Sequence, residues 1–208
     1  MILPYWLQKM YRHAKLKQCD FKALHYVAMD LELTGLDVNK CEIVSVAWLN
    51  FDSLNISLHT AQYYLNKEVK SLAQSPIYHG IDETMLEQGD KLENIILRLA
   101  QVVEGQVLVC HNAVLDWAFI KNASNVIGVE IKPRAILDTM LIEKRRLTST
   151  GQPIAVDSLT LPACRKRYQL PDYQTHNALV DTLATAELLL AQVSSISAGK
   201  RIKLADLM

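Results

Sequence analysis

Between residues 26 and 64 the apolar positions follow the pattern of strands rather than helices. Tyr26–Met29 is an uninterrupted apolar run that predicts a buried strand, and Glu42–Phe51 is rich in branched and aromatic residues. Asn55–Tyr64 alternates less regularly and predicts a third strand. Because no helical pattern separates these segments, we expect the three strands to form an antiparallel meander.

Beyond residue 77, helical patterns alternate with short apolar strands. The expected elements are a turn into a short helix at 77–86, a helix at 90–104, a strand at 106–110, a helix after Asn112, a strand passing into a helix at 136–141, and helices at 158–170 and 182–193. Three strands followed by this alternation predict an α/β fold. Its mixed central sheet would combine the antiparallel meander with parallel strands and be flanked by helices.

One principal domain is expected at residues 25–193, with an N-terminal extension at 1–24 and a C-terminal tail at 194–208. The extension mixes apolar and basic residues and predicts an amphipathic helix. It is either a basic arm that contacts nucleic acid or a partner, or a helix packed on the domain, and the second interpretation is favoured. For the tail, a motif that binds a polymerase clamp competes with simple packing or fraying, and the second is again favoured.

Composition narrows the class of protein. The 208 residues include 22 Lys and Arg and 22 Asp and Glu, so the formal net charge is zero. This excludes a purely electrostatic nucleic-acid binder, though not an enzyme that acts on nucleic-acid ends. The four cysteines, at 19, 41, 110 and 164, lack metal-ligand spacing and predict reduced thiols. No apolar stretch approaches the roughly 20 residues that cross a bilayer and no signal peptide is evident, so we expect a soluble cytoplasmic protein without membrane contact.

A pair of carboxylates stands at the end of the first predicted strand. Side chains two residues apart in a strand share a face, so Asp30 and Glu32 project together. Two adjacent carboxylates repel one another and raise each other's pKa unless a cation lies between them. Gly35 then permits the backbone turn that ends the strand. The pair is expected to form half of a metal site.

Two more carboxylates are expected early in helices. Asn112 is a candidate helix cap, which places Asp116 in the first turns of its helix, and Asp181 begins the last helix. Oxygen ligands favour hard ions such as Mg²⁺ or Mn²⁺. Two such ions would neutralise the carboxylates and activate a water for attack on a phosphodiester. His176 can take the proton of that water if it lies on the loop before the last helix.

Three segments carry a resemblance to a known family: DLELTG at 30–35, HNAVLD at 111–116 and HNALVD at 176–181. In this order they resemble the three motifs of the DEDDh, or DnaQ-like, 3′–5′ exonucleases, which include the proofreading epsilon subunit of bacterial DNA polymerase III and ribonuclease T. The resemblance covers about residues 26–193, and HGI at 79–81 and LDT at 137–139 also resemble connecting segments of that family. Asn177 stands where a related branch has tyrosine, which indicates the histidine branch.

The resemblance implies a ribonuclease-H-like fold and a site with two divalent cations, Mg²⁺ or Mn²⁺. It assigns His176 as general base and, as metal ligands, Asp30, Glu32, Asp116 and Asp181. It also implies substrate contacts by Leu33, Thr34, Gly35, His79, His111, Asn112 and Leu115. Leu33 and Leu115 stand where the family often has threonine and phenylalanine.

Some of these contacts have a second interpretation. His111 and Asn112 either shape the loop that supports Asp116 or touch the substrate backbone, and His79 is either a structural turn residue or a neighbour of the site. Adjacent strand residues point to opposite faces, so Cys110 is interpreted as a buried thiol rather than as a nucleophile paired with His111.

Asp138 and two basic runs also have two interpretations each. Asp138 is interpreted as a helix cap rather than as a spare ligand. The basic runs Lys144–Arg146 and Arg165–Arg167 either contact phosphates upstream of the cleaved end or form a solvated surface.

The expected function is metal-dependent 3′–5′ exonuclease activity that releases nucleoside 5′-monophosphates in proofreading, repair or end trimming. The expected substrates are single-stranded 3′ ends, with DNA favoured over RNA. Association with a DNA polymerase subunit or clamp is left open, as is a homodimer. The alternatives are an exoribonuclease that trims RNA 3′ ends and a non-catalytic, polymerase-associated scaffold. The complete set of four carboxylates and one histidine argues against the scaffold.

Overall fold

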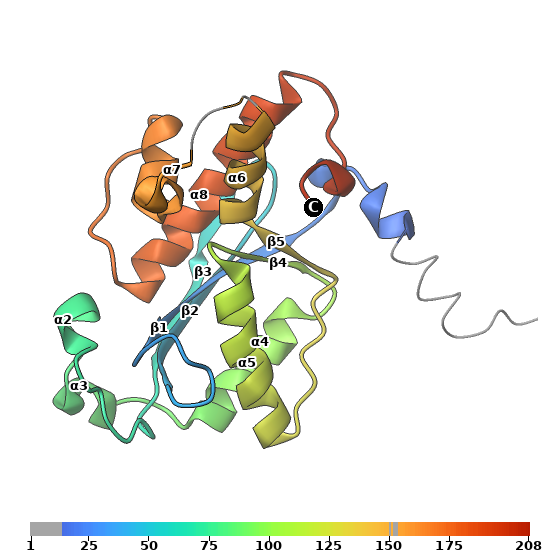
Figure 1. Cartoon of the computed structure of the whole chain (residues 1–208). Helices are drawn as coiled ribbons and strands as arrows, with labels where there is room; N and C mark the ends of the chain where they lie inside the picture. The colour runs from blue at the N-terminus through green and yellow to red at the C-terminus, as the bar shows by residue number, and fades with distance from the viewer. Residues whose placement is uncertain (1–13, 150, 152–153) are drawn as a thin grey trace, which may run out of the picture.

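The computed structural model describes residues 14–149, 151 and 154–208. Its centre is a mixed five-stranded sheet in the order β3-β2-β1-β4-β5, with helices on both faces (Figure 1). The strands are β1 Tyr26–Leu33, β2 Ile43–Phe51, β3 Ile56–Leu65, β4 Val107–Cys110 and β5 Ala135–Asp138. β1, β2 and β3 pair antiparallel, whereas β4 runs parallel to β1 and β5 runs parallel to β4. The predicted meander and mixed sheet are confirmed.

Helices α4 to α8 lie in two groups, one on each face of the sheet, and the short helices α2 and α3 belong to neither group (Figure 1). Their bounds are α2 Pro76–His79, α3 Glu83–Glu87, α4 Leu92–Val103, α5 Ala113–Ile127, α6 Thr139–Ser149, α7 Leu161–Arg167 and α8 Ala178–Ser197. Three short 3₁₀ helices are found at Phe21–Ala23, Val156–Leu159 and Leu204–Asp206. Figure 1 shows α6, α7 and α8 gathered on one side of the sheet, with α4 and α5 on the other. Strand β1, in the middle, is covered by both groups.

Alternation along β1 determines which carboxylates meet α8. Ala28 packs into the hydrophobic core beneath α8, and its neighbour Met29 packs into the core beneath α4 and α5. Asp30 and Glu32 continue the phase of Ala28 because side chains alternate along a strand. The central strand therefore directs both carboxylates toward the face that α8 covers.

The bounds predicted for the helix at 158–170 are wrong. The segment is a 3₁₀ helix, Val156–Leu159, followed by the shorter α7. Pro162 stands in the first turn of α7, where a missing N–H costs nothing, so the helix can begin there but cannot run through it. At the other end Gln169 has a left-handed backbone, with φ of 56°, and helical geometry is lost by then.

Helix α8 is longer at both ends than the predicted helix at 182–193. It begins at Ala178 because the Asn177 side chain accepts hydrogen bonds from the N–H groups of Leu179 and Val180. Its end at Ser197 takes the first residues of the expected tail into the helix. The rest of the tail packs on the domain, with three side chains buried in the core beneath α8: Ile202, Leu204 and Leu207.

The length of α8 also bears on the expectation that no segment could cross a membrane. Among the described residues, α8 is the one helix that is long and apolar enough to do so by length and composition. In the structure it packs against β1 and β2, so its apolar side chains form part of the core.

The predicted helix at 1–24 lies largely outside the described residues. Residues 14–17 are helical, and Leu16 is buried in the core beneath α8. A helix does not continue to residue 24, because Asp20 pairs with Lys203 in an isolated bridge and then caps the 3₁₀ helix Phe21–Ala23.

Candidate active site

Three carboxylates converge where β1 meets the start of α8. Asp30 and Glu32 come from β1 and Asp181 from the first turn of α8. One ligand oxygen of each lies within 4.8 Å of those of the other two. Glu32 is only 8% exposed. The convergence that the sequence predicts for these three residues is therefore present.

The electrostatics of this cluster are unfavourable without a cation. Burial raises the pKa of Asp30 well above its ordinary value, and the charges of Asp116, Asp181 and Glu32 raise it further. Burial, followed by the charge of Asp181, raises the pKa of Glu32 to about 7. Burial also raises the pKa of Asp181, against the opposing effect of its hydrogen bond from the His176 backbone. Three oxygen donors in this state fit a hard divalent cation.

Asp116 lies beside the cluster of three rather than within it. It stands in the first turn of α5, is 5% exposed, and its Oδ2 has no hydrogen-bond partner among the described residues. Burial and the charge of Asp138 raise its pKa, with the Cys110 thiol acting in the opposite direction. An orphaned buried carboxylate oxygen fits a metal ligand, and Asp116 is close enough to raise the pKa of Asp30.

Asp138 holds the starts of two helices, as its interpretation as a cap predicts. Its Oδ2 accepts from the N–H of Ala113 at 2.9 Å, and its Oδ1 accepts from the N–H of Met140 at 2.9 Å. Asn112 occupies the predicted cap position of α5, but its side chain makes no capping bond and its φ is 79°. Oδ1 of Asp138 instead accepts from the N–H of Asn112 at 3.1 Å, so the start of α5 and with it Asp116 are anchored from β5.

Replacing Asp138 by alanine is expected to lower the free energy of unfolding by about 1–3 kcal/mol, because it leaves N–H groups at the starts of both α5 and α6 without their hydrogen-bond acceptor. Urea unfolding measures the change. Asp82→Ala is the matched control, since Asp82 caps only the short, exposed helix α3. A cost for Asp138→Ala no greater than that for Asp82→Ala would contradict this role.

His111 is held on both ring nitrogens by the protein. Nδ1 lies 2.8 Å from Thr139 Oγ1, and Nε2 donates to the Leu159 carbonyl at 2.8 Å. Burial lowers its pKa, which favours the neutral ring. Of the two roles weighed for His111, these contacts support the shaping of the loop after β4 rather than contact with substrate.

His176 lies on the loop before α8, where the sequence analysis places it. Its φ is 65°, and its backbone N–H donates to Asp181 Oδ2 at 2.9 Å. The imidazole is exposed and meets the ring of Tyr78 edge-on, with centroids 6.2 Å apart. The same short segment thus orients one carboxylate through its backbone and presents an exposed imidazole beside it.

A pocket of about 400 Å³ adjoins Glu32. Among its lining residues are five of the predicted substrate contacts: Leu33, Thr34, Gly35, His79 and Leu115. The wall also contains two exposed side chains that are not predicted from the sequence, Tyr78 and Leu36, which are 68% and 77% exposed. Tyr78 directly precedes the HGI segment, and that proximity is the signal that would have found it.

Two of these lining residues have structural roles as well. His79 Nε2 lies 2.9 Å from Ser75 Oγ, and its Nδ1 accepts from the N–H of Ile81 at 3.0 Å, so its ring fixes the turn after α2. Gly35 does not have the positive φ of a glycine turn. A Cβ there would lie 2.7 Å from Cys41 Sγ, so glycine is needed for close packing and not, as expected, for a turn.

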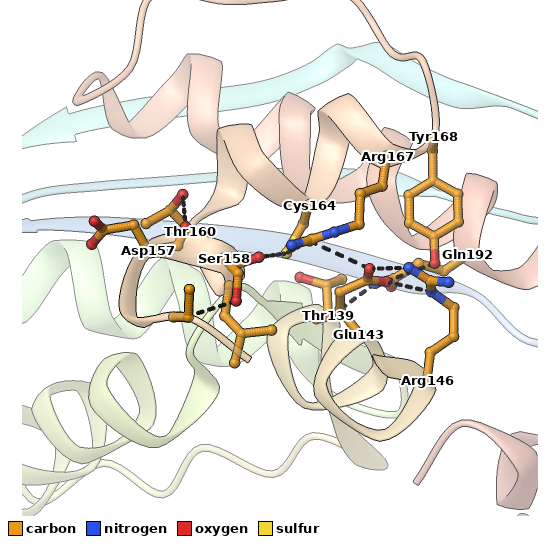
Figure 2. Close-up of polar contacts among 12 residues, drawn as sticks. Thr139, Glu143, Arg146, Asp157, Ser158, Thr160, Cys164, Arg167, Tyr168 and Gln192 are labelled. Carbon is orange, nitrogen blue, oxygen red and sulfur yellow. Dashed lines mark hydrogen bonds and ion pairs between the residues drawn. The ribbon is translucent and has the colours of Figure 1, made fainter. Parts of the chain in front are cut away.

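The basic runs are largely engaged within the protein. Arg165 is buried against α8, and Arg145 donates to the carbonyls of Leu207 and Met208. Arg146 and Arg167 pair with the fully buried Glu143 (Figure 2). Because Arg165 is buried, the structure corrects the prediction that it contacts phosphates or forms part of a solvated surface, while Arg145, Arg146 and Arg167 remain partly or fully exposed.

With this geometry in place, comparison with known proteins identifies the family. Residues 27–189 match the exonuclease family RNase_T, and the chain belongs to that family. Exonucleases of this kind use divalent metal ions, which fits the carboxylate cluster. The chain forms an exonuclease domain of this family.

Similar proteins include a DNA polymerase III subunit epsilon-like protein from Rhodobacter capsulatus, 29% identical over 177 residues, which are 84% of this chain and 24% of that protein. A DNA polymerase III PolC-type protein from Caldanaerobacter subterraneus is 25% identical over 171 residues, 82% of this chain and 12% of that protein. The chain thus spans no more than a quarter of the length of these relatives.

Two solved structures share the fold. A structure of exonuclease I superposes with a TM-score of 0.72 at 15% identity, covering 83% of this chain and 41% of that chain. The cell-death related nuclease 4 has a TM-score of 0.71 at 16% identity, covering 85% and 65%. Together with the mixed sheet flanked by helices, these likenesses confirm the ribonuclease-H-like fold.

Proposed function

We propose that this chain is a metal-dependent 3′–5′ exonuclease that hydrolyses phosphodiester bonds at the 3′ ends of single-stranded nucleic acid, with DNA favoured, and releases nucleoside 5′-monophosphates. The observation that carries this proposal is the convergence of Asp30, Glu32 and Asp181 within 4.8 Å in a setting that raises their pKa values. Such a cluster opposes folding unless a cation neutralises it. We assign the activity to residues 25–193.

Asp30, Glu32 and Asp181 would hold two divalent ions, Mg²⁺ or Mn²⁺, and the orphaned Oδ2 of Asp116 would complete the ligand set. When bound by these residues, such ions would supply activation of a water and stabilisation of the leaving oxygen. His176 accepts the proton of the attacking water through its exposed imidazole. The N–H of His176 meanwhile donates to Oδ2 of Asp181 and so orients that carboxylate.

The pocket next to Glu32 supports a nucleobase as the group that binds there. Its apolar wall contains Leu33, Leu36 and Leu115, and Tyr78 offers an aromatic face on which a base can stack. Structures of E. coli exonuclease I, which share this fold, contain dT13 and dA16 oligonucleotides. This supports single-stranded DNA as the substrate class for the present chain.

The cellular setting follows from the relatives and the thiols. Relatives named as a DNA polymerase III epsilon-like protein and as PolC-type polymerases support association with a DNA polymerase or its clamp. All four cysteines are free, which supports a reducing compartment such as the cytoplasm.

Digestion of three matched substrates tests the proposal. The protein with Mg²⁺ is incubated with single-stranded DNA, single-stranded RNA and a duplex with a mismatched 3′ end, each labelled at its 5′ end. We expect stepwise shortening from the 3′ end and nucleoside 5′-monophosphate products, fastest for single-stranded DNA. Preferred digestion of RNA would support the exoribonuclease alternative, and absence of cleavage with either Mg²⁺ or Mn²⁺ would overturn the proposal.

The raised carboxylate pKa values predict how stability depends on pH without metal. Glu32 has an ordinary pKa of 4.5 and a pKa of about 7 when folded. Between these values the folded state binds more protons than the unfolded chain, so stability falls as pH rises. We expect the melting temperature in EDTA to fall across this range, and Mg²⁺ to restore it at pH 7 far more than at pH 5.

The Glu32→Gln variant is the control for this dependence, because it removes the titrating group and keeps the side-chain shape. Its melting temperature in EDTA should fall less than that of the parent over the same range, as followed by scanning calorimetry. The prediction is contradicted if the melting temperature of the parent in EDTA rises from pH 5 to pH 7. It is also contradicted if the melting temperatures of the parent and the variant change equally over this range.

A further inference from the structure

The loop that carries His176 is held at its base by the guanidinium group of a buried arginine. Arg165, in α7, has a side chain only 4% exposed. Its Nη1 donates to the carbonyl of Ala184 in α8 at 2.8 Å, and its Nη2 donates to the carbonyl of Pro171 in the loop at 2.9 Å. One guanidinium therefore joins α7, the loop and the middle of α8.

Two side chains close a ring around this guanidinium. Arg165 Nη2 forms an ion pair with Glu187 Oε2 of α8 at 2.8 Å, and Tyr173 Oη of the loop donates to Glu187 Oε1 at 2.9 Å. The guanidinium carbon lies 4.5 Å from the centroid of the Tyr173 ring. Arg165, Glu187 and Tyr173 thus contact one another pairwise, and we refer to these three residues as the loop clamp.

The loop depends on these side chains because its own backbone offers few anchors. Among the described residues, residues 171–175 make no backbone–backbone hydrogen bond. Only Gln174 and Thr175 separate Tyr173 from His176. The loop clamp is therefore the last side-chain anchor before the imidazole, and the next anchor is the bond from the His176 N–H to Asp181.

We propose that the loop clamp positions His176, with Arg165 acting as a positioning residue for the general base. This inference rests on the proposed exonuclease function. By fixing Pro171 and Tyr173 against α8, the clamp sets where the exposed imidazole stands over the carboxylates. Geometry of this kind governs rate, since a displacement of about 1 Å at a reacting group can cost about 100-fold.

The same helix provides a matched comparison on its other side. Arg167 Nη1 lies 3.5 Å from Oε1 of the buried Glu143, which also binds Arg146 and accepts from Tyr168 Oη at 2.7 Å (Figure 2). This cluster ties α7 to α6. Arg165 and Arg167 are thus arginines of one helix, each paired with a glutamate, and Arg165 alone of the two contacts the segment 169–176.

Three variants test the loop clamp. Arg165→Met combined with Glu187→Met removes both charges and so leaves no unpaired ion. Tyr173→Phe removes one hydrogen bond, and Arg167→Met breaks the comparison pair. Each protein is measured for hydrogen exchange of the His176 N–H, which is bonded to Asp181, in EDTA, for melting temperature, and for kcat and KM on single-stranded DNA.

We expect faster exchange of the His176 N–H in the double variant, because its hydrogen bond to Asp181 opens more often when the loop is loosened, and a smaller change in the same direction in Tyr173→Phe. In the double variant kcat should fall by about 10- to 100-fold with KM changed by less than about threefold, because the general base is misplaced while substrate binding remains. Arg167→Met should keep the exchange of the His176 N–H and kcat at parental values.

Two results would overturn the loop clamp. One is a double variant with parental exchange of the His176 N–H or with parental kcat. The other is an Arg167→Met variant that loses kcat and protection of the His176 N–H as much as the double variant, since this would indicate general loss of stability. The hydrogen-exchange measurement does not depend on catalysis. If the parent protein cleaves no substrate but its exchange still changes when the loop clamp is removed, only the proposed function is overturned.

Discussion

The Asp30→Asn variant is expected to lose exonuclease activity by about 1000-fold or more. A metal ion supplies several kcal/mol of charge stabilisation in a transition state, and each 1.36 kcal/mol is a factor of ten in rate. Asp30 is the carboxylate whose pKa is raised by all three of its neighbours, so it lies where their negative charges meet. Removing the charge of Asp30 therefore weakens the binding of the metal ions. Single-turnover cleavage of a labelled single strand measures the loss.

The same substitution should stabilise the metal-free protein. An uncharged asparagine removes the repulsion with Asp116, Asp181 and Glu32, so the melting temperature in EDTA should rise by a few degrees. Opposite signs for activity and for stability distinguish loss of a functional charge from loss of the fold.

Asp52→Asn is the matched control for this experiment. Asp52 makes an Asx turn between β2 and β3, in which Oδ1 accepts from the N–H groups of Leu54 and Asn55, and asparagine can make the same turn. The control should retain parental activity and melting temperature. An Asp30→Asn protein as active as Asp52→Asn would show that Asp30 is not a metal ligand.

The parts of the site that the sequence predicts correctly depend on short-range regularities. Asp30 and Glu32 share a face because strands alternate, and the burial of apolar residues in β1 fixes that phase. His176 and Asp181 are linked through a helix start, whose cap at Asn177 lies between them. Each relation spans no more than five residues, so a local pattern is sufficient to predict it.

The parts that the sequence does not predict depend on partners far along the chain. Three consecutive basic residues on a helix point about 100° apart, so one of Arg165–Arg167 faces inward, yet which one depends on Glu187 and the carbonyl of Ala184. The anchor of α5 is likewise Asp138, 26 residues from Asn112. Such roles appear only when the sheet brings distant segments together.

His176→Asn is expected to lower kcat by about 100- to 10,000-fold, the range for loss of a general base. Asparagine is the informative replacement because the backbone of His176 has a φ of 65°, a conformation that asparagine adopts more readily than alanine. The variant therefore keeps the N–H bond to Asp181 at 2.9 Å while it removes the imidazole. Rapid-quench measurement of single-turnover rates gives the change in the chemical step.

Metal affinity separates this role from that of a ligand. The imidazole is exposed and stands outside the group formed by Asp30, Glu32 and Asp181, so Mg²⁺ binding measured by calorimetry should match the parent. Rates of the variant should also rise with pH, because hydroxide can replace the missing base. A variant that binds Mg²⁺ much more weakly would place His176 among the ligands, and one with parental kcat would require another base.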